Sequence, residues 1–130
     1  MLTLLAFLKR RADLSPAAFR DYYDNHHVPL VLGFTAPPLV YKRNYLRRDD
    51  LLLDGGDKIQ FDVVVEQVFS DRAAFERWIG DLSAPGVGEQ IKADEARFLD
   101  HAQYFAYLVD QDVTTEPATP AKTWSRQPEG

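Results

Sequence analysis

The stretch from Leu14 to Val31 (LSPAAFRDYYDNHHVPLV) constrains the fold most, because it predicts an amphipathic helix that ends beside two histidines. The Ser15 side chain can accept a hydrogen bond from an early backbone N–H, and Pro16 already has a helical φ, so this pair predicts the helix start. Pro29 has no N–H, so we expect the helix to kink or end near it. The apolar face at helical spacing comprises Phe19, Tyr23, His26 and Leu30.

Four segments have the pattern of β-strands. Leu2–Leu8 and His101–Val109 are apolar in both alternating phases, which is typical of strands covered on both faces. Leu39–Arg47 is more polar, as an edge strand is, and Ile59–Phe69 is the clearest strand because β-branched and aromatic residues dominate it. We assign one phase of that strand to the face covered by helices, namely Ile59, Phe61, Val63, Val65, Gln67 and Phe69.

Two further helices follow that strand. Ser70 is the expected cap of the first, with Asp71 favourable at its positive end, and Pro85-Gly86 separates it from the second. The order is therefore β-α-β-β-α-β with the second helix split in two, which predicts a ferredoxin-like split-βαβ fold of class α+β: a four-stranded antiparallel sheet with helices on one face. The apolar stripes of these helices comprise Phe75, Trp78, Ile79 and Leu82, and then Val87, Ile91, Glu95 and Phe98.

The uncovered face of such a sheet needs a partner. We assign the leucine, alanine and tyrosine phases of the first and last strands to this outer face, including Tyr104 and Leu108. An apolar face of that size does not stay exposed on a monomer. The pattern therefore predicts a homodimer in which two sheets pack face to face.

Length and charge narrow the class. The 130 residues fit one domain, which we place at 1–110, followed by a polar, proline-containing tail at 111–130. The net charge of -5 argues against nucleic acid and anionic membranes as partners. The chain has no cysteine, which excludes disulfides and thiolate metal sites and suits a cytoplasmic protein. No signal peptide is evident, and no apolar run approaches the roughly 20 residues of a membrane span.

Five segments of the chain, in order, resemble the EthD family (named for ethyl tert-butyl ether degradation) of the dimeric α+β barrel superfamily. They cover roughly residues 2–109, and the most specific are His-x-Pro-Leu at His27–Leu30 and the run DEARFLD. The resemblance implies a dimeric barrel whose pocket lies between each subunit's own sheet and helices. Relatives include cofactor-free isomerases, oxygenases and cyclases, so the family does not fix the reaction. The segments are FLKR, LSPAAFRDYYDNHHVPL, YKRNYL, FDVVVEQVFSD and ADEARFLD.

The two histidines compete for the pocket. Helix periodicity places His26 on the apolar stripe, whereas the family pattern points to His27, and a kink before Pro29 could turn the last residues of the helix. We expect His27 to exchange a proton with the substrate, because a neutral imidazole does so near pH 7. We expect His26 to be mainly structural, although it remains a candidate for substrate contact.

Three other polar residues are site candidates. Tyr41 aligns with a pocket tyrosine of a lactone-isomerising relative, which implies that its phenol holds a substrate oxygen. Glu95 lies on an apolar helix stripe, so it is either a second acid/base group or an ion-pair partner of Arg43. Gln67 is the polar residue in the helix-facing phase of its strand, so it can orient a ligand.

The leading hypothesis is a cofactor-independent isomerase, dehydratase or cyclase acting on a small apolar, aromatic or polyketide-like compound. No metal site is expected, because adjacent helical histidines diverge by about 100°. No cofactor is expected either, because the sequence contains no glycine-rich phosphate-binding loop. The alternatives are a non-catalytic small-molecule-binding accessory protein and a cofactor-free monooxygenase. The residues expected to line the pocket, or else to form plain core, are Phe7, Tyr23, Phe61, Val63, Val65, Trp78 and Phe98.

Overall fold

The predicted order of strands and helices is confirmed. The computed structural model describes residues 1–50, 52 and 58–115, so most of the expected tail lies outside the described part. The elements are β1 (Leu2–Arg10), α1 (Pro16–Tyr22), a π-helical turn η1 (Tyr23–His27), α2 (Val28–Leu32), β2 (Val40–Tyr45), β3 (Val63–Phe69), α3 (Arg72–Leu82), α4 (Val87–Glu95) and β4 (Leu99–Val109).

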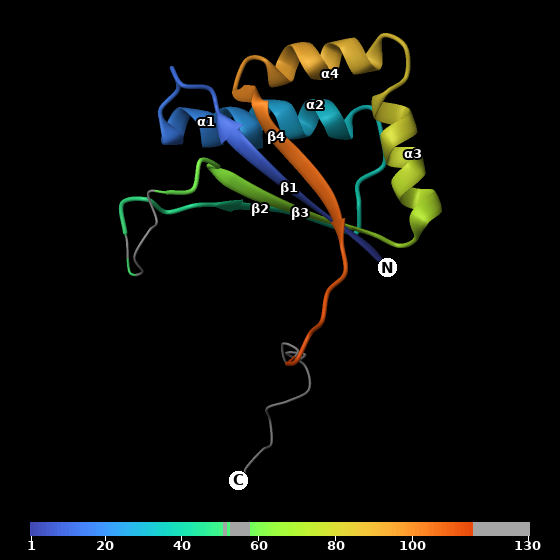
Figure 1. Ribbon diagram of the computed structural model, residues 1–130. Coiled ribbons are helices and arrows are strands. Elements are labelled where there is room, and N and C mark those ends of the chain that lie inside the picture. Colours follow the sequence, from blue (N-terminus) through green and yellow to red (C-terminus); the bar gives the residue numbers. More distant parts are fainter. Residues whose placement is uncertain (51, 53–57, 116–130) are drawn as a thin grey trace, which may run out of the picture.

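The strands form one antiparallel sheet in the order β2-β3-β1-β4. Ala6 of β1 pairs with Val65 of β3 on one side and with Ala106 of β4 on the other. The helices lie on one face of this sheet, with α1 and α2 forming one continuous helical path (Figure 1). This is the ferredoxin-like α+β fold that the sequence predicts.

The helix-facing side of β3 is assigned correctly from Val63 onward. Burial alternates along this strand, and Val63, Val65, Gln67 and Phe69 are its buried residues. The strand begins later than the predicted Ile59. The preceding Asp62 instead accepts a hydrogen bond from the Arg10 backbone N–H at 2.8 Å.

The sheet faces of β1 and β4 are the reverse of the prediction. Phe7 pairs with Phe105, and both lie on the outer face, where the Phe61 ring centroid is 5.5 Å from that of Phe7. Tyr104 and Leu108 face the helices instead, so their assignment to the outer face is wrong. The assignment of Phe7 and Phe61 to the pocket is also wrong, because both lie on the outer face. Both phases of these strands are apolar, so only the register with β3 decides which phase faces the helices.

The helix starts follow their capping residues. The Ser15 hydroxyl accepts a hydrogen bond from the Ala18 backbone N–H at 3.1 Å, which confirms the predicted cap. For α3 the cap is Asp71 rather than Ser70, because the Asp71 carboxylate accepts from the Ala74 N–H at 2.8 Å. None of the helices in the described ranges has the length and apolar character needed to cross a membrane.

Candidate functional site

The π-helical turn decides which histidine is buried. In η1 the backbone N–H of Val28 reaches the carbonyl of Tyr23, five residues earlier. The wider turn keeps residues four apart on one face, so the buried series becomes Phe19, Tyr23, His27 and Val31. His27 is 5% exposed. The helical path also continues through Pro29 to Leu32, so the helix does not end there, and the irregularity expected as a kink or an end near Pro29 is this change of helix type.

His26 lies outside the pocket. It is exposed, and its ring stacks on that of Tyr22 with centroids 4.9 Å apart. Its expected contact with a substrate is therefore not supported by its position. The 3.6-residue period places His26 on the buried stripe only if the helix is regular, and η1 breaks that regularity.

His27 has a carboxylate partner that the sequence did not reveal. Its Nδ1 lies 2.8 Å from Oδ2 of Asp94, and the Tyr22 hydroxyl donates to the other oxygen of Asp94 at 2.6 Å. Because an ionised carboxylate only accepts, the proton of the neutral ring lies on Nδ1. Nε2 makes no hydrogen bond within the part of the chain that the structure describes, so its lone pair is free to accept a proton.

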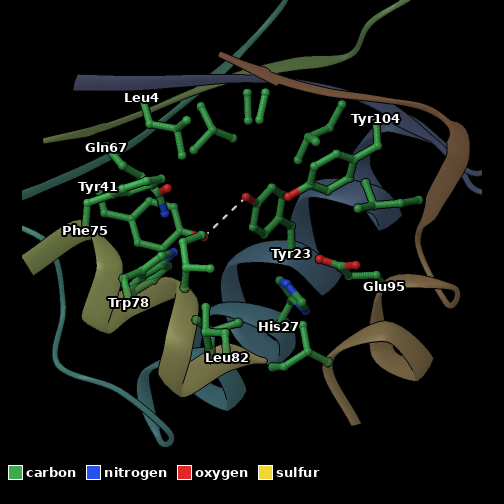
Figure 2. A pocket seen from close by; sticks show the side chains of 18 of the residues that line it. Leu4, Tyr23, His27, Tyr41, Gln67, Phe75, Trp78, Leu82, Glu95 and Tyr104 are labelled. Carbon is green, nitrogen blue, oxygen red and sulfur yellow. Dashed lines mark hydrogen bonds between the residues drawn. The ribbon is translucent and has the colours of Figure 1, made fainter. Parts of the chain in front are cut away.

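His27 faces a cavity of about 430 Å³ between the sheet and the helices. Side chains from β1, β2, β3, β4, η1, α2, α3 and α4 converge on this hollow, and Figure 2 shows Tyr23, Tyr41, His27 and Glu95 around it. Its walls are mostly apolar, with a few polar groups, which is the usual character of a small-molecule site. Its apolar walls include Leu4, Val31, Val65, Phe75, Trp78, Leu82, Ile91 and Phe98.

Two phenols form a donor pair inside the cavity. The hydroxyls of Tyr23 and Tyr41 are 3.3 Å apart, so one donates to the other and the second keeps a hydrogen for a ligand. Burial raises the pKa of both phenols, although the Tyr23 hydrogen bond and the nearby charge of Arg43 act in the opposite direction on Tyr41. Both groups are therefore neutral donors at physiological pH.

The guanidinium of Arg43 packs over both of these rings. Its guanidinium carbon lies 5.1 Å from the ring centroid of Tyr41 and 5.6 Å from that of Tyr23. Asp24 holds it through the Arg43 Nε–H at 2.8 Å and also accepts from the Tyr45 hydroxyl at 2.6 Å. Burial alone would raise the pKa of Asp24, but these hydrogen bonds and the arginine charges outweigh it and lower that pKa.

Glu95 and Gln67 supply the other polar groups. Glu95 ends α4, lines the cavity and pairs with His101, its Oε1 lying 3.1 Å from Nε2, so the expected pair with Arg43 is wrong. The Gln67 residue is 6% exposed, lines the cavity and makes no side-chain hydrogen bond among residues 1–50, 52 and 58–115. Because buried amides normally have partners, Gln67 is available to a ligand.

The cavity brings together eight of the residues singled out from the sequence and omits four. His26, Phe7 and Phe61 lie elsewhere, and Val63 is fully buried in the core rather than in the wall. Sequence reasoning missed Asp94 and the inward position of Tyr104. The available signal for Asp94 was its place in the DEARFLD segment. The eight are His27, Tyr41, Glu95, Tyr23, Val65, Gln67, Trp78 and Phe98.

Comparisons with known proteins agree with this architecture. The family model of the EthD domain matches residues 11–102. An EthD family protein from Bacillus halodurans is 15% identical, with a TM-score of 0.56, covering 86% of this chain and 100% of that one. No curated protein matches the sequence.

Two further solved structures share the fold. The protein At3g17210 from Arabidopsis thaliana is 11% identical, with a TM-score of 0.58, covering 89% of this chain and 100% of its own. HapK from Hahella chejuensis is 15% identical, with a TM-score of 0.52, covering 92% and 99%. At these identities the similarity establishes the fold and no more.

Proposed function

The chain belongs to the EthD domain family, and from this premise we propose that it is a cofactor-independent enzyme that moves a proton on a small aromatic or polyketide-like compound. The observation that carries the proposal is the His27 ring, held at Nδ1 by Asp94 and free at Nε2 beside the cavity. A buried, oriented imidazole of this kind suits general base catalysis. Isomerisation, dehydration and cyclisation can all begin with such a step.

The proposed step is proton removal from a carbon next to a carbonyl. Nε2 of His27 takes the proton, the C–H electron pair forms a C=C bond, and the carbonyl electrons move to oxygen to give an enolate. The free hydroxyl hydrogen of the Tyr23–Tyr41 pair donates to that oxygen. The imidazolium is stabilised by the Asp94 carboxylate at 2.8 Å. Return of the proton to a different atom completes an isomerisation.

We assign Glu95 the role of a second proton acceptor. Its carboxylate lines the same cavity and is not neutralised by an arginine or lysine among the described lining residues. It can accept a proton from a substrate hydroxyl when His27 acts as the acid. Gln67 and Trp78 then position the ligand through the uncommitted amide and an apolar wall.

We also propose a homodimer through the outer sheet face. Phe105 and Tyr107 are 42% and 59% exposed there, beside Phe7 and Phe61. The ring centroids of Phe7 and Tyr107 are 6.4 Å apart, so these side chains form one continuous aromatic patch. A patch of this kind, made of neighbouring rings, is typical of a contact surface between subunits.

Hydrogen–deuterium exchange tests the proton transfer without knowledge of the natural substrate. The probe is 2-tetralone, a bicyclic ketone, with exchange of its C1 protons in D2O followed by proton NMR. We expect the wild type to exceed the rate in buffer. General base assistance contributes typically about 10²–10⁴-fold, so His27→Gln should lose nearly all of the protein-dependent rate.

The matched control is His26→Gln, which changes the neighbouring exposed imidazole in the same way. Circular dichroism and thermal unfolding establish that both variants fold. Equal exchange rates in the wild type and His27→Gln would contradict the proposal. Equal losses in the two variants would also contradict it, because the loss would not be specific to the imidazole in the cavity.

A further inference from the structure

The cavity wall carries one carboxylate, and in the described part of the chain this carboxylate pairs with a histidine, His101, and not with an arginine or lysine. Among the described residues that line it, Glu95 is the only one of the types Asp, Glu, Lys and Arg. Its side chain is 18% exposed. The charge of this carboxylate therefore acts on whatever ligand the cavity holds.

The placement of Glu95 is not explained by the helix that carries it. Glu95 is the last residue of α4, at the end where the helix dipole disfavours a negative charge. Its Oε1 contacts His101, while Oε2 makes no hydrogen bond within the part of the chain that the structure covers. One carboxylate oxygen is thus left for a ligand.

Among the described residues, the cavity wall contains no arginine or lysine to offset this charge. The half-buried guanidinium of Arg43 lies over the rings of Tyr23 and Tyr41 and is hydrogen-bonded to Asp24 at 2.8 Å. The effect of Glu95 reaches the phenols: burial raises the pKa of Tyr104, and the charge of Glu95 raises it further. A ligand carboxylate would lose its hydration here and meet a like charge.

We propose that Glu95 makes this cavity selective for uncharged ligands that present a hydroxyl group to it, and that it excludes ligands carrying a carboxylate at that position. The substrate class is then a neutral hydroxylated aromatic, such as a phenolic ketone, rather than an aromatic acid. The inference rests on the proposed function only in taking this cavity as the substrate site.

Three probes of similar size separate these contributions. Each is a naphthalene with a methoxy group as the acceptor for the tyrosine pair, and they differ in the second substituent: 7-methoxy-2-naphthol, 2,7-dimethoxynaphthalene and 7-methoxy-2-naphthoate. Binding is followed at neutral pH by naphthalene fluorescence. A hydrogen bond to a charged acceptor corresponds to about 10- to 100-fold in affinity, so we expect the naphthol to bind at least about tenfold more tightly than either other probe.

The variant Glu95→Gln keeps the size of the side chain and removes its charge. We expect the preference for the naphthol over the naphthoate to fall by about tenfold or more in this variant, chiefly because the naphthoate gains affinity. The matched control is Glu76→Gln on α3, where the glutamate pairs with Arg72 on the surface. This control should keep the wild-type preference.

An unchanged preference in Glu95→Gln, or tighter binding of the naphthoate by the wild type, would overturn the inference. These titrations do not depend on turnover. A protein that prefers the naphthol yet shows no His27-dependent exchange would retain this selectivity and lose the enzyme proposal. Exchange that depends on His27, together with equal binding of the three probes, would support the enzyme proposal and overturn the selectivity proposed for Glu95.

Discussion

The tautomer of His27 is the feature that Asp94 should control, and Asp94→Ala is the perturbation that tests it. In the native structure the Nδ1–H of His27 donates to Oδ2 of Asp94 at 2.8 Å. This distance falls in the range of charge-assisted hydrogen bonds. With the carboxylate removed, no other described side chain is hydrogen-bonded to Nδ1, so the proton is free to move to Nε2.

The size of the effect follows from that single bond. A hydrogen bond to a charged group contributes about 1.5–3 kcal/mol, which corresponds to a ratio of about 10- to 100-fold between the two tautomers. In the wild type the neutral ring should therefore be almost entirely the Nδ1–H form. In Asp94→Ala the Nε2–H form should become a substantial share. The protein-dependent exchange of 2-tetralone should fall by about 10- to 100-fold, chiefly because the carboxylate no longer stabilises the imidazolium that forms when Nε2 takes the proton.

Nitrogen-15 NMR of the imidazole ring measures the tautomer directly, since the protonated and unprotonated ring nitrogens have different chemical shifts. The matched control is Tyr22→Phe, which removes the hydrogen bond to the other oxygen of Asp94 and leaves the contact with His27 in place. This variant should keep the Nδ1–H form. A wild-type ring in the Nε2–H form, or an unchanged ring in Asp94→Ala, would refute the reasoning.

Three other perturbations test separate parts of the account. Tyr107→Glu should convert the dimer to monomer in light scattering, because it places a charge in a dry interface, whereas Leu32→Glu, at an exposed apolar position on α2, should not; dimers of both variants would contradict the proposed interface. Asp24 has a lowered pKa, so its contribution to stability is present above its unfolded pKa of about 3.9 and is lost as pH falls below that value. Urea unfolding should show this loss of stability at acidic pH in the wild type and not in Asp24→Asn. The same dependence of the unfolding free energy on acidic pH in both proteins would contradict the role of Asp24. Removal of residues 111–130 should lower the melting temperature by only a few degrees, as expected of a polar tail; a larger drop would show that the tail packs on the body.

Local chemistry made part of the fold predictable. The cap at Ser15 depends on a hydroxyl and a proline next to each other, so two residues of sequence suffice to identify it. The alternation of Val63, Val65 and Gln67 likewise gives the buried face of β3, because the opposite phase is more polar. These features do not need information from distant segments.

The site required information that local patterns do not contain. A regular helix would bury His26. The π-helical turn buries His27 instead, together with Tyr23 and Val31, and the sequence pattern does not reveal this turn. The resemblance to the family favoured His27, because His27 matches the histidine of His-x-Pro-Leu, whereas helix periodicity favoured His26. Asp94 contacts His27 across 67 residues of sequence, and the adjacent Glu95 is an equally plausible partner until α4 is placed.

The predicted faces of β1 and β4 were wrong for a related reason. Both phases of β1 and β4 are apolar, so composition gave no preference between Phe7 and Ala6 for the helix side. Register with β3 resolves this, because Ala6 pairs with Val65, which faces the helices. The aromatic patch then falls on the outer face and Tyr104 falls in the cavity.

A crystal structure of the wild type soaked with 2-tetralone tests the central claim most directly, since exchange does not consume the ketone. We expect the ketone in the cavity, with its oxygen about 2.7–3.1 Å from the Tyr41 or Tyr23 hydroxyl and its C1 within about 3.5 Å of Nε2 of His27. Asp94 should remain hydrogen-bonded to Nδ1 in that complex. A ketone bound in the cavity with C1 turned away from His27, or bound only on the outer sheet face, would contradict the assignment of His27 as the base.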